Sequence, residues 1–284
     1  MDDNIGLCCG SLVQTDFKGL VAAAAAAGFS NISLWPTLYE AALGDGMSER
    51  DMQTMLNDHG LAVGELDPCS SWLPVELAPD DLAVAFHRYT EDDFYRMADA
   101  FGARSLNLIQ QGPDDTPLSQ RSELIGSLCE RATAHGLLVS FEFMPWSPVA
   151  NLAQAMELVA MVGHDDFGVN IDIWHHFRSG GSIAELAEVD PAWVTAVQFN
   201  DVASEPWPDP LQETSQGRLM PGMGSSDSTA VLSALRSAGV TSPLSVEVFS
   251  AELMAMPPTE VAVELMTRMT EVLDRTRREP CEPS

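Results

Sequence analysis

Short apolar runs and helix-patterned segments alternate along this chain. The apolar runs have the length and the β-branched or aromatic content of buried strands. They lie at residues 4–9, 31–35, 61–66, 105–110, 137–143, 167–173, 194–199 and 244–249. Between them, apolar residues recur at helical spacing, as at residues 17–29, 121–136 and 259–278. Several helical segments end at a glycine, such as Gly28 and Gly163, which is typical of a left-handed C-terminal cap.

This alternation predicts the fold class. Strands separated by helices form a parallel sheet, because each helix returns the chain to the same edge. Eight such units within the 284 residues match a closed barrel. A doubly wound open sheet is the alternative, but the first turn, CCGSLVQTD, lacks the expected glycines. We therefore predict an α/β fold, a single-domain (β/α)8 TIM barrel at residues 1–276, followed by a flexible C-terminal tail at residues 277–284.

The charge balance narrows the range of partners. The chain has 14 basic and 42 acidic residues, for a net charge of −28. Such a surface repels phosphate backbones and anionic lipids, so we expect neither a nucleic acid nor a membrane as a partner. Lys18, the only lysine, lies at the start of a helix-patterned segment and is badly placed for Schiff-base chemistry.

The cysteines indicate a reducing compartment. Cys8, Cys9, Cys69, Cys129 and Cys281 are odd in number and form no CxxC pair, so neither a disulfide framework nor a thiolate zinc site is indicated. Cys8 and Cys69 are expected to be small core residues, with pocket lining as the alternative. The N-terminus lacks the features of a signal peptide, and no apolar run is long enough to span a membrane. We expect a cytoplasmic protein.

Four oxygen-bearing side chains end consecutive strand-like runs in the second half. Glu142 closes LLVSFEF, Asp172 closes FGVNIDI, Gln198 closes VTAVQF, and Glu247 lies in PLSVEVF. In a barrel the C-terminal ends of the strands open into one bowl, so these side chains are expected to be neighbours. Buried carboxylates are costly unless something compensates them, and oxygen ligands suit a hard divalent cation. The alternative is a set of buried, hydrogen-bonded acids.

The segments FEFMPW, NIDIWHHFRSGG, VQFND, RLMPGMG and SVEVFS resemble the xylose isomerase-like TIM-barrel superfamily of sugar isomerases, epimerases and dehydratases. The resemblance runs from the first strand to the last helix. It implies one divalent metal, with Mn²⁺ favoured over Mg²⁺ or Co²⁺, bound by Glu142, Asp172, Gln198 and Glu247. Many members have a histidine where this chain has Gln198, and the 3-dehydroshikimate dehydratase-like members are similar to it in using glutamine.

His175 follows Asp172 by three residues, where the family has a histidine that contacts substrate and moves a proton. An acid or base is useful beside a metal-bound carboxylate, and the alternative is a histidine that only orients Asp172. His176 is expected to face away, because neighbours alternate on an extended chain. The remaining histidines are expected at the surface: His59, His87, His135 and His164.

Two arginines and several aromatic residues are candidates for substrate binding. Arg218 lies in QGRLMPGMG, where family members carry a basic residue that binds substrate oxygens and could stabilise an enolate. Arg178 is a second candidate, unless it pins a loop through an acid such as Asp201. The aromatic residues expected at the rim, with the first three as substrate contacts, are Trp35, Trp146, Trp174, Trp72, Phe143 and Phe177. The Pro-rich stretches 67–80 and 203–226 are expected to form lids or substrate loops.

These observations predict a metal-dependent isomerase, epimerase or dehydratase (a lyase) of carbohydrate metabolism. It would act on a small molecule, next to the carbonyl of a keto-sugar, cyclitol or dehydroshikimate-like ring, through an enediolate. Glu142 and Glu247 would bind the metal and also transfer protons, with His175 as the third catalytic residue. Gln198 tilts the prediction toward dehydration. The fold is compatible with a homo-oligomer.

Two other classes are weighed against this prediction. An endonuclease IV-like DNA repair enzyme would need a His-rich metal cluster and a basic groove, which this acidic chain lacks. A non-catalytic or partner-dependent barrel subunit that binds a sugar-like ligand is the second alternative. The acids Glu142, Asp172 and Glu247 and the histidine His175 favour an active enzyme.

Overall fold

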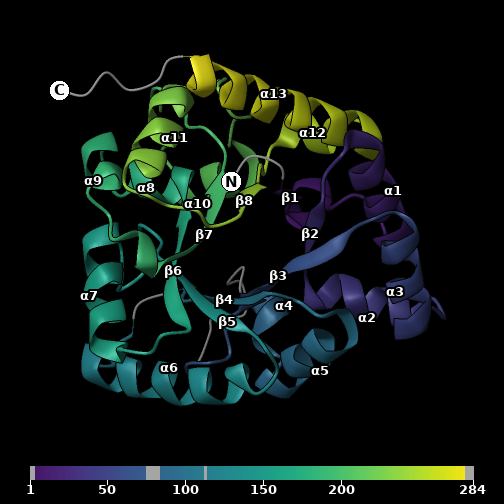
Figure 1. The fold of residues 1–284 in the computed structure, drawn as a ribbon, viewed down its shortest axis with the longest axis horizontal. Helices are drawn as coiled ribbons and strands as arrows, with labels where there is room; N and C mark the ends of the chain where they lie inside the picture. Colours follow the sequence, from purple (N-terminus) through teal and green to yellow (C-terminus); the bar gives the residue numbers. More distant parts are fainter. Residues whose placement is uncertain (1–3, 75–83, 112–113, 279–284) are drawn as a thin grey trace.

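The computed structural model describes residues 4–74, 84–111 and 114–278. Eight parallel strands pair in chain order, and the last pairs with the first, so the sheet closes into a barrel (Figure 1). The strands are β1 (Ile5–Leu7), β2 (Asn31–Leu34), β3 (Ala62–Cys69), β4 (Ser105–Ile109), β5 (Leu138–Glu142), β6 (Phe167–Asp172), β7 (Val194–Phe199) and β8 (Leu244–Val246). The predicted single-domain (β/α)8 TIM barrel is confirmed.

Helices surround the barrel and cover its outer face (Figure 1). The longer ones are α1 (Phe17–Ala27), α2 (Pro36–Gly44), α3 (Glu49–Asp58), α5 (Glu91–Phe101), α6 (Leu118–Thr133), α7 (Leu152–Val162), α11 (Ser228–Ser237) and α13 (Pro258–Arg278). The shorter ones are α4 (Val84–His87), α8 (Ile173–Arg178), α9 (Ile183–Ala187), α10 (Pro210–Gln216) and α12 (Ala251–Met254), with the 3-10 helices η1 (Cys9–Leu12) and η2 (Pro191–Trp193). Gly28 and Gly163 cap α1 and α7 in the left-handed conformation, as predicted.

The first and last helices of the chain pack together in the helical ring. The first helix, α1, packs against the last, α13, which closes the outer layer (Figure 1). Helix α13 runs through Arg278 and so includes the first two residues of the predicted tail, while residues 279–284 lie outside the described part. Each helix that the structure describes is too short or too polar to span a lipid bilayer.

The interior of the barrel is polar. Apolar and polar side chains alternate along the strands, and the apolar set belongs to the core shared with the helices, as Phe141 and Ile171 do. The polar set therefore faces the barrel axis. Its buried members are Asn31, Ser33, Glu65, Asp67, Ser105, Asn107, Ser140, Glu142, Asn170, Asp172 and Gln198. Branched apolar residues fill this space in most TIM barrels, so the axis of this one is unusually rich in hydrogen-bonding groups.

Candidate active site

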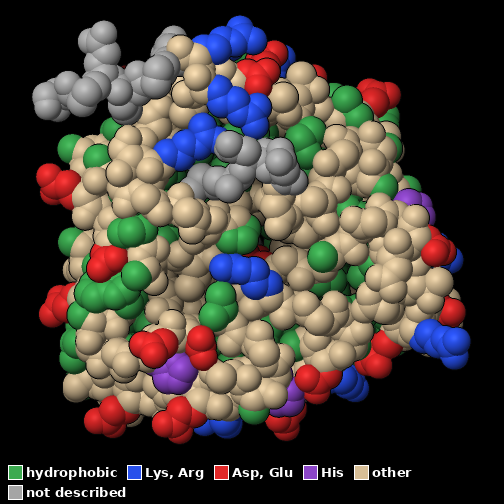
Figure 2. Space-filling model, viewed as in Figure 1, with side chains coloured by type: hydrophobic (Ala, Val, Ile, Leu, Met, Phe, Trp, Pro, Cys, Tyr) green, Lys and Arg blue, Asp and Glu red, His purple; other side chains and the backbone are tan. Residues whose placement is uncertain are grey.

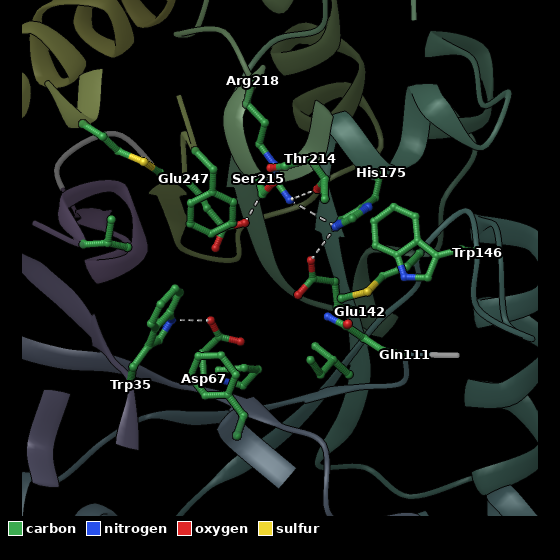
Figure 3. A pocket seen from close by; sticks show the side chains of 17 residues that line it. Trp35, Asp67, Gln111, Glu142, Trp146, His175, Thr214, Ser215, Arg218 and Glu247 are labelled. Atoms are coloured by element: carbon green, nitrogen blue, oxygen red, sulfur yellow. Dashed lines mark hydrogen bonds and ion pairs between the residues drawn. The ribbon is translucent and has the colours of Figure 1, made fainter. Parts of the chain in front are cut away.

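The C-terminal ends of the strands open into a pocket of about 250 Å³. Its polar lining comes from separate elements: Asp67 in β3, Glu142 at the end of β5, His175 in α8 and Glu247 just after β8. The segment 203–226 adds Arg218 and two side chains from α10 (Figure 3). This segment therefore forms one wall of the pocket, as predicted. The second predicted lid, residues 67–80, continues beyond the described residues after position 74.

Three of the four predicted metal ligands form a tight cluster. Oxygen atoms of Glu142, Asp172 and Glu247 all lie within 4.8 Å of one another, and each side chain is buried. Glu142 and Glu247 line the pocket, while Asp172 lies beneath it with no exposed surface. Asp172 also begins α8, because its Oδ1 accepts a hydrogen bond from the backbone N–H of His175 at 2.8 Å.

Gln198 lies beside this cluster. Its Nε2 donates to Glu247 Oε1 at 3.3 Å and to Glu65 Oε1 at 3.5 Å. Its carbonyl oxygen Oε1 is buried and has no hydrogen-bond partner among the described residues. An unpaired buried carbonyl beside three carboxylates is the donor set that a hard divalent cation prefers, so the four predicted residues fit a metal ion.

Arg218 joins two of the carboxylates. Its Nη1 donates to Asp172 Oδ2 at 2.7 Å and to Glu247 Oε2 at 2.8 Å. Its Nε and Nη2 donate to the carbonyl and hydroxyl of Thr214 at 3.0 and 2.9 Å. The guanidinium also lies over the Phe249 ring, 4.6 Å from its centroid. These contacts fix the only arginine or lysine among the described residues that line the pocket.

The pKa values reflect an incomplete balance of charge. Burial raises the pKa of Glu247 well above its ordinary value despite the lowering by Arg218, and the charges of Glu142 and Asp172 add to the increase. Burial also tends to raise the pKa of Asp172, but Arg218 and His175 hold it below its usual value. The site thus contains more negative charge than its one guanidinium neutralises.

His175 faces a donor and an acceptor through the same ring nitrogen. Its Nε2 lies 3.2 Å from Arg218 Nη2, which can only donate, and 3.2 Å from Glu142 Oε1, which can accept. When Nε2 carries no proton, it can accept a hydrogen bond from Arg218. When it carries a proton, it can donate one to Glu142. The ring packs edge-on against Trp146, at 5.3 Å between centroids, and borders the pocket.

Only some of the aromatic residues predicted to contact substrate line the pocket. Trp35 and Trp146 line the pocket. Trp174 does not: it has no exposed surface and lies under Arg218, whose guanidinium is 5.5 Å from its ring centroid. This corrects its predicted role from a substrate contact to a support for Arg218. Three other aromatics predicted at the rim are packed in or against the core instead: Trp72, Phe143 and Phe177.

Arg178 anchors a loop but through a different acid from the one predicted. It pairs with the buried Glu213 of α10, with Nε 3.0 Å from Oε1, and donates to the Ala203 carbonyl at 3.0 Å. Asp201 is occupied elsewhere, since it accepts from Ser226 Oγ at 2.7 Å and from neighbouring groups. Arg178 does not line the pocket, so its predicted substrate contact is corrected to a structural link holding α10.

His176 faces away from the pocket, but not for the reason predicted. The chain after Asp172 is the helix α8 rather than an extended segment. His176 is buried, and its Nε2 lies 3.0 Å from the Ser182 carbonyl.

Asp67 is a pocket residue that the sequence reasoning missed. It lies in β3, is 4% exposed, and accepts hydrogen bonds from Trp35 Nε1 at 3.0 Å and Asn107 Nδ2 at 2.9 Å. Asn107 also donates to Glu142 Oε2 at 2.7 Å, so it links the two acids. The signal is present in the sequence, because LAVGELD ends on an acid, and the runs that contain Glu142, Asp172 and Glu247 each have an acid near the end.

Cys8 also contacts the site, although the sequence indicated a core residue. It is buried, and its Sγ donates to Glu247 Oε1 at 2.9 Å. Burial, Cys9 and Glu247 raise the pKa of this thiol well above its ordinary value. The thiol therefore acts as a hydrogen-bond donor in this arrangement. Cys69 is buried in the core, as expected.

Comparison with known proteins agrees with this architecture. The family model of the xylose isomerase-like TIM barrel matches residues 21–272. An inosose isomerase from Halalkalibacterium halodurans is 28% identical over 154 residues, 54% of this chain and 54% of that protein. A 3-dehydroshikimate dehydratase from Pseudomonas aeruginosa is 28% identical over 151 residues, 53% of this chain and 24% of that protein. The chain thus matches about half the length of the first relative and less of the second.

Among solved structures, that of the IolI protein with a bound zinc atom superposes with a TM-score of 0.83. The superposition covers 96% of this chain and 99% of that protein, at 18% identity. At this identity the likeness is one of fold.

Proposed function

Because this chain belongs to the xylose isomerase-like TIM barrel family, we propose that it is an isomerase, epimerase or dehydratase of a small ring ketone or keto-sugar. The reaction would begin by moving a proton at the carbon next to a carbonyl. Inosose isomerase and 3-dehydroshikimate dehydratase among the relatives support this class of reaction. The single observation that carries the proposal is the buried cluster of Glu142, Asp172 and Glu247 beneath a pocket that His175 lines.

Glu142, Asp172, Gln198 and Glu247 would hold one divalent metal, with Mn²⁺ first and Mg²⁺ or Co²⁺ as alternatives. The unpaired Gln198 carbonyl and the uncompensated carboxylates support this assignment, as does the zinc bound by the IolI protein. When bound, the metal would polarise the substrate carbonyl and so acidify the neighbouring C–H bond.

The two glutamates differ from the other two ligands in their access to substrate. Glu142 and Glu247 border the pocket, whereas Asp172 and Gln198 lie below it. One glutamate would remove the proton next to the carbonyl, and the other would return it. His175 would exchange a proton with the migrating or departing oxygen through Nε2, and Arg218 would neutralise developing negative charge on oxygen.

The test is proton exchange in D₂O by the metal-loaded protein, with inosose, 3-dehydroshikimate and keto-sugars as substrates. We expect deuterium to enter at the carbon next to the carbonyl, together with an isomerised, epimerised or dehydrated product. The Glu247→Gln variant should lose at least about a hundredfold in rate, as expected when a proton-transfer group is removed. The matched control is Glu252→Gln on the exposed surface of α12. Full activity in Glu247→Gln would refute its role.

A ligand-binding barrel without catalysis is the second candidate. The observation that favours it is Arg218, whose Nη1 already bridges Asp172 and Glu247 as a cation would. This candidate predicts that a ring ligand binds while no deuterium enters it, with or without added metal.

A further inference from the structure

Among the described residues, the pocket contains one permanently positive side chain, and all of its nitrogens are hydrogen-bonded. All 14 basic residues of the chain fall within the described ranges, and Arg218 is the one that borders the pocket. Each of its guanidinium nitrogens already has a partner: Nη1 has Asp172 and Glu247, Nε has Thr214, and Nη2 has Thr214 and His175. An anionic substrate group would have to displace these contacts to pair with a cationic side chain.

Asp67 adds a further acidic side chain to the pocket, with a carboxyl oxygen within 4.8 Å of one of Glu247. In Figure 3, Asp67 and Trp35 lie across the pocket from Arg218 and His175. The N–H groups of Trp35 and Asn107 fix the Asp67 carboxylate in place. The surfaces around it are apolar, including those of Pro68 and Phe86.

This wall distinguishes between substrate groups of different charge. The Asp67 carboxyl group can form a hydrogen bond with a substrate hydroxyl whether or not it holds its proton, but it offers no positive charge to a carboxylate or a phosphate. The opposite edge offers no free cationic side chain either, because Arg218 is already paired with Asp172 and Glu247. In a buried, mostly apolar pocket an unpaired substrate anion costs more free energy than it would in water.

We propose that the site selects an uncharged ring polyol ketone and excludes a ring of the same size that carries a carboxylate or a phosphate. A ring hydroxyl would bind Asp67, the ring face would stack on Trp35, and the carbonyl edge would face Glu142, His175 and Arg218. The inference deepens the proposed function and rests on it for the reaction, but not for binding. It favours inosose-like over dehydroshikimate-like substrates, whereas Gln198 on its own favours a dehydratase.

The test is calorimetric binding of inosose and of 3-dehydroshikimate to the full metal-loaded chain. We expect inosose to bind at least about tenfold more tightly. Asp67→Asn should weaken inosose binding and so reduce the ratio of the inosose affinity to the 3-dehydroshikimate affinity. Val13→Arg adds a cation at the pocket rim, where Val13 is 48% exposed, and should tighten 3-dehydroshikimate binding without disturbing the core. Asp58→Asn, exposed on α3, makes the same change in net charge away from the pocket and should alter neither affinity.

Binding and turnover separate the two proposals. Equal or tighter binding of 3-dehydroshikimate by the wild-type protein overturns the charge selection, even if inosose is turned over. A ratio unchanged in both Asp67→Asn and Val13→Arg overturns it as well. A tenfold preference for inosose without deuterium exchange supports the selection and contradicts the proposed enzyme activity. Failure of both rings to bind contradicts the selection.

Discussion

Two aspartates at the same site, Asp67 in the pocket wall and Asp172 beneath it, have opposite pKa shifts. Burial tends to raise the pKa of both Asp67 and Asp172. Arg218 lies against Asp172 and outweighs that effect, whereas Asp67 has no cation in contact and also feels the charge of Glu142. The pKa of Asp67 is therefore raised to about 7, although Asn107 and Trp35 donate hydrogen bonds to it. Position relative to one arginine determines the behaviour of each acid.

The raised pKa of Asp67 predicts a pH dependence of stability. In the unfolded chain Asp67 releases its proton near 3.8, but in the folded chain it keeps that proton up to about pH 7. Folding therefore takes up a proton between these values, and the free energy of unfolding falls as pH rises through this window. The slope from one group is at most about 1.4 kcal/mol per pH unit.

Urea unfolding of the chelated protein at several pH values between 4 and 8, a range spanning this window, measures this slope. Asp67→Asn should show a shallower decline than the wild type, while Asp58→Asn, on the surface of α3, should not. Equal slopes in the wild type and Asp67→Asn would show that Asp67 titrates normally in the folded protein.

Single residues also show where sequence reasoning stops. Glu142, Asp172 and Glu247 can be predicted because an acid at the end of an apolar run is recognisable in the amino-acid sequence alone. The partner of Arg178 could not, since Glu213 reaches it only after α10 folds back over the barrel. The position of Trp174 is not predictable from the sequence for a similar reason: its depth below the pocket depends on packing with Arg218 rather than on its sequence position.

At the scale of elements, short helices were harder to predict than long ones. Helix α8 spans only Ile173–Arg178, which is too short for an apolar period to emerge, so the segment was expected to be extended. Its start is determined by Asp172, which caps the first turn. The same hydrogen bond places His175 beside the carboxylates. One bond therefore both starts the helix and positions a residue of the site.

Helix η1 gives a prediction at this scale, because Gly10 lies between two aromatic walls of the pocket. A Cβ at position 10 would come within 2.4 Å of ring atoms of both Trp35 and Phe249. Gly10→Ala should therefore displace these rings, weaken ring-ligand binding severalfold, and lower the free energy of unfolding by about 1–3 kcal/mol. Calorimetric titration and urea unfolding measure the two effects.

Gly126→Ala is the matched control for this substitution. Gly126 lies within α6, and an added Cβ there would meet no heavy atom within 4 Å. This variant should stabilise the protein by about 0.5–1 kcal/mol, since alanine favours helix, and leave binding unchanged. Wild-type affinity in Gly10→Ala would mean that the two rings do not shape the bound ligand.

At the scale of the whole molecule, the repeated strand and helix pattern was enough to predict the barrel. Closure follows from the pairing of β1 with β8 and the packing of α1 on α13, which a count of eight units implies. The acidic excess was equally visible, and Figure 2 shows acidic side chains around the ring of helices. The sequence could not reveal how Arg218 distributes its bonds within the site, because that depends on four separate segments meeting at the axis.

Metal binding would couple the site to the stability of the entire fold. An ion that binds only the folded chain stabilises it by mass action, by about 2.7 kcal/mol at a hundred times its dissociation constant. After chelation, Mn²⁺ should therefore raise the unfolding temperature of the wild type, and elemental analysis should find about one ion per chain. Asp172→Asn removes a buried ligand and should abolish the increment that Mn²⁺ produces, whatever its effect on the metal-free protein.

Asp165→Asn, an exposed substitution before β6, controls for weak binding of Mn²⁺ to the acidic surface. It should keep the full increment, because surface acids bind the ion only loosely. If the wild type gains no more than Asp172→Asn, the ion is held by the surface rather than by the cluster. Arg218 would then be the permanent counter-charge of Asp172 and Glu247, and the ligand-binding barrel would replace the metal-dependent enzyme as the better account of this site.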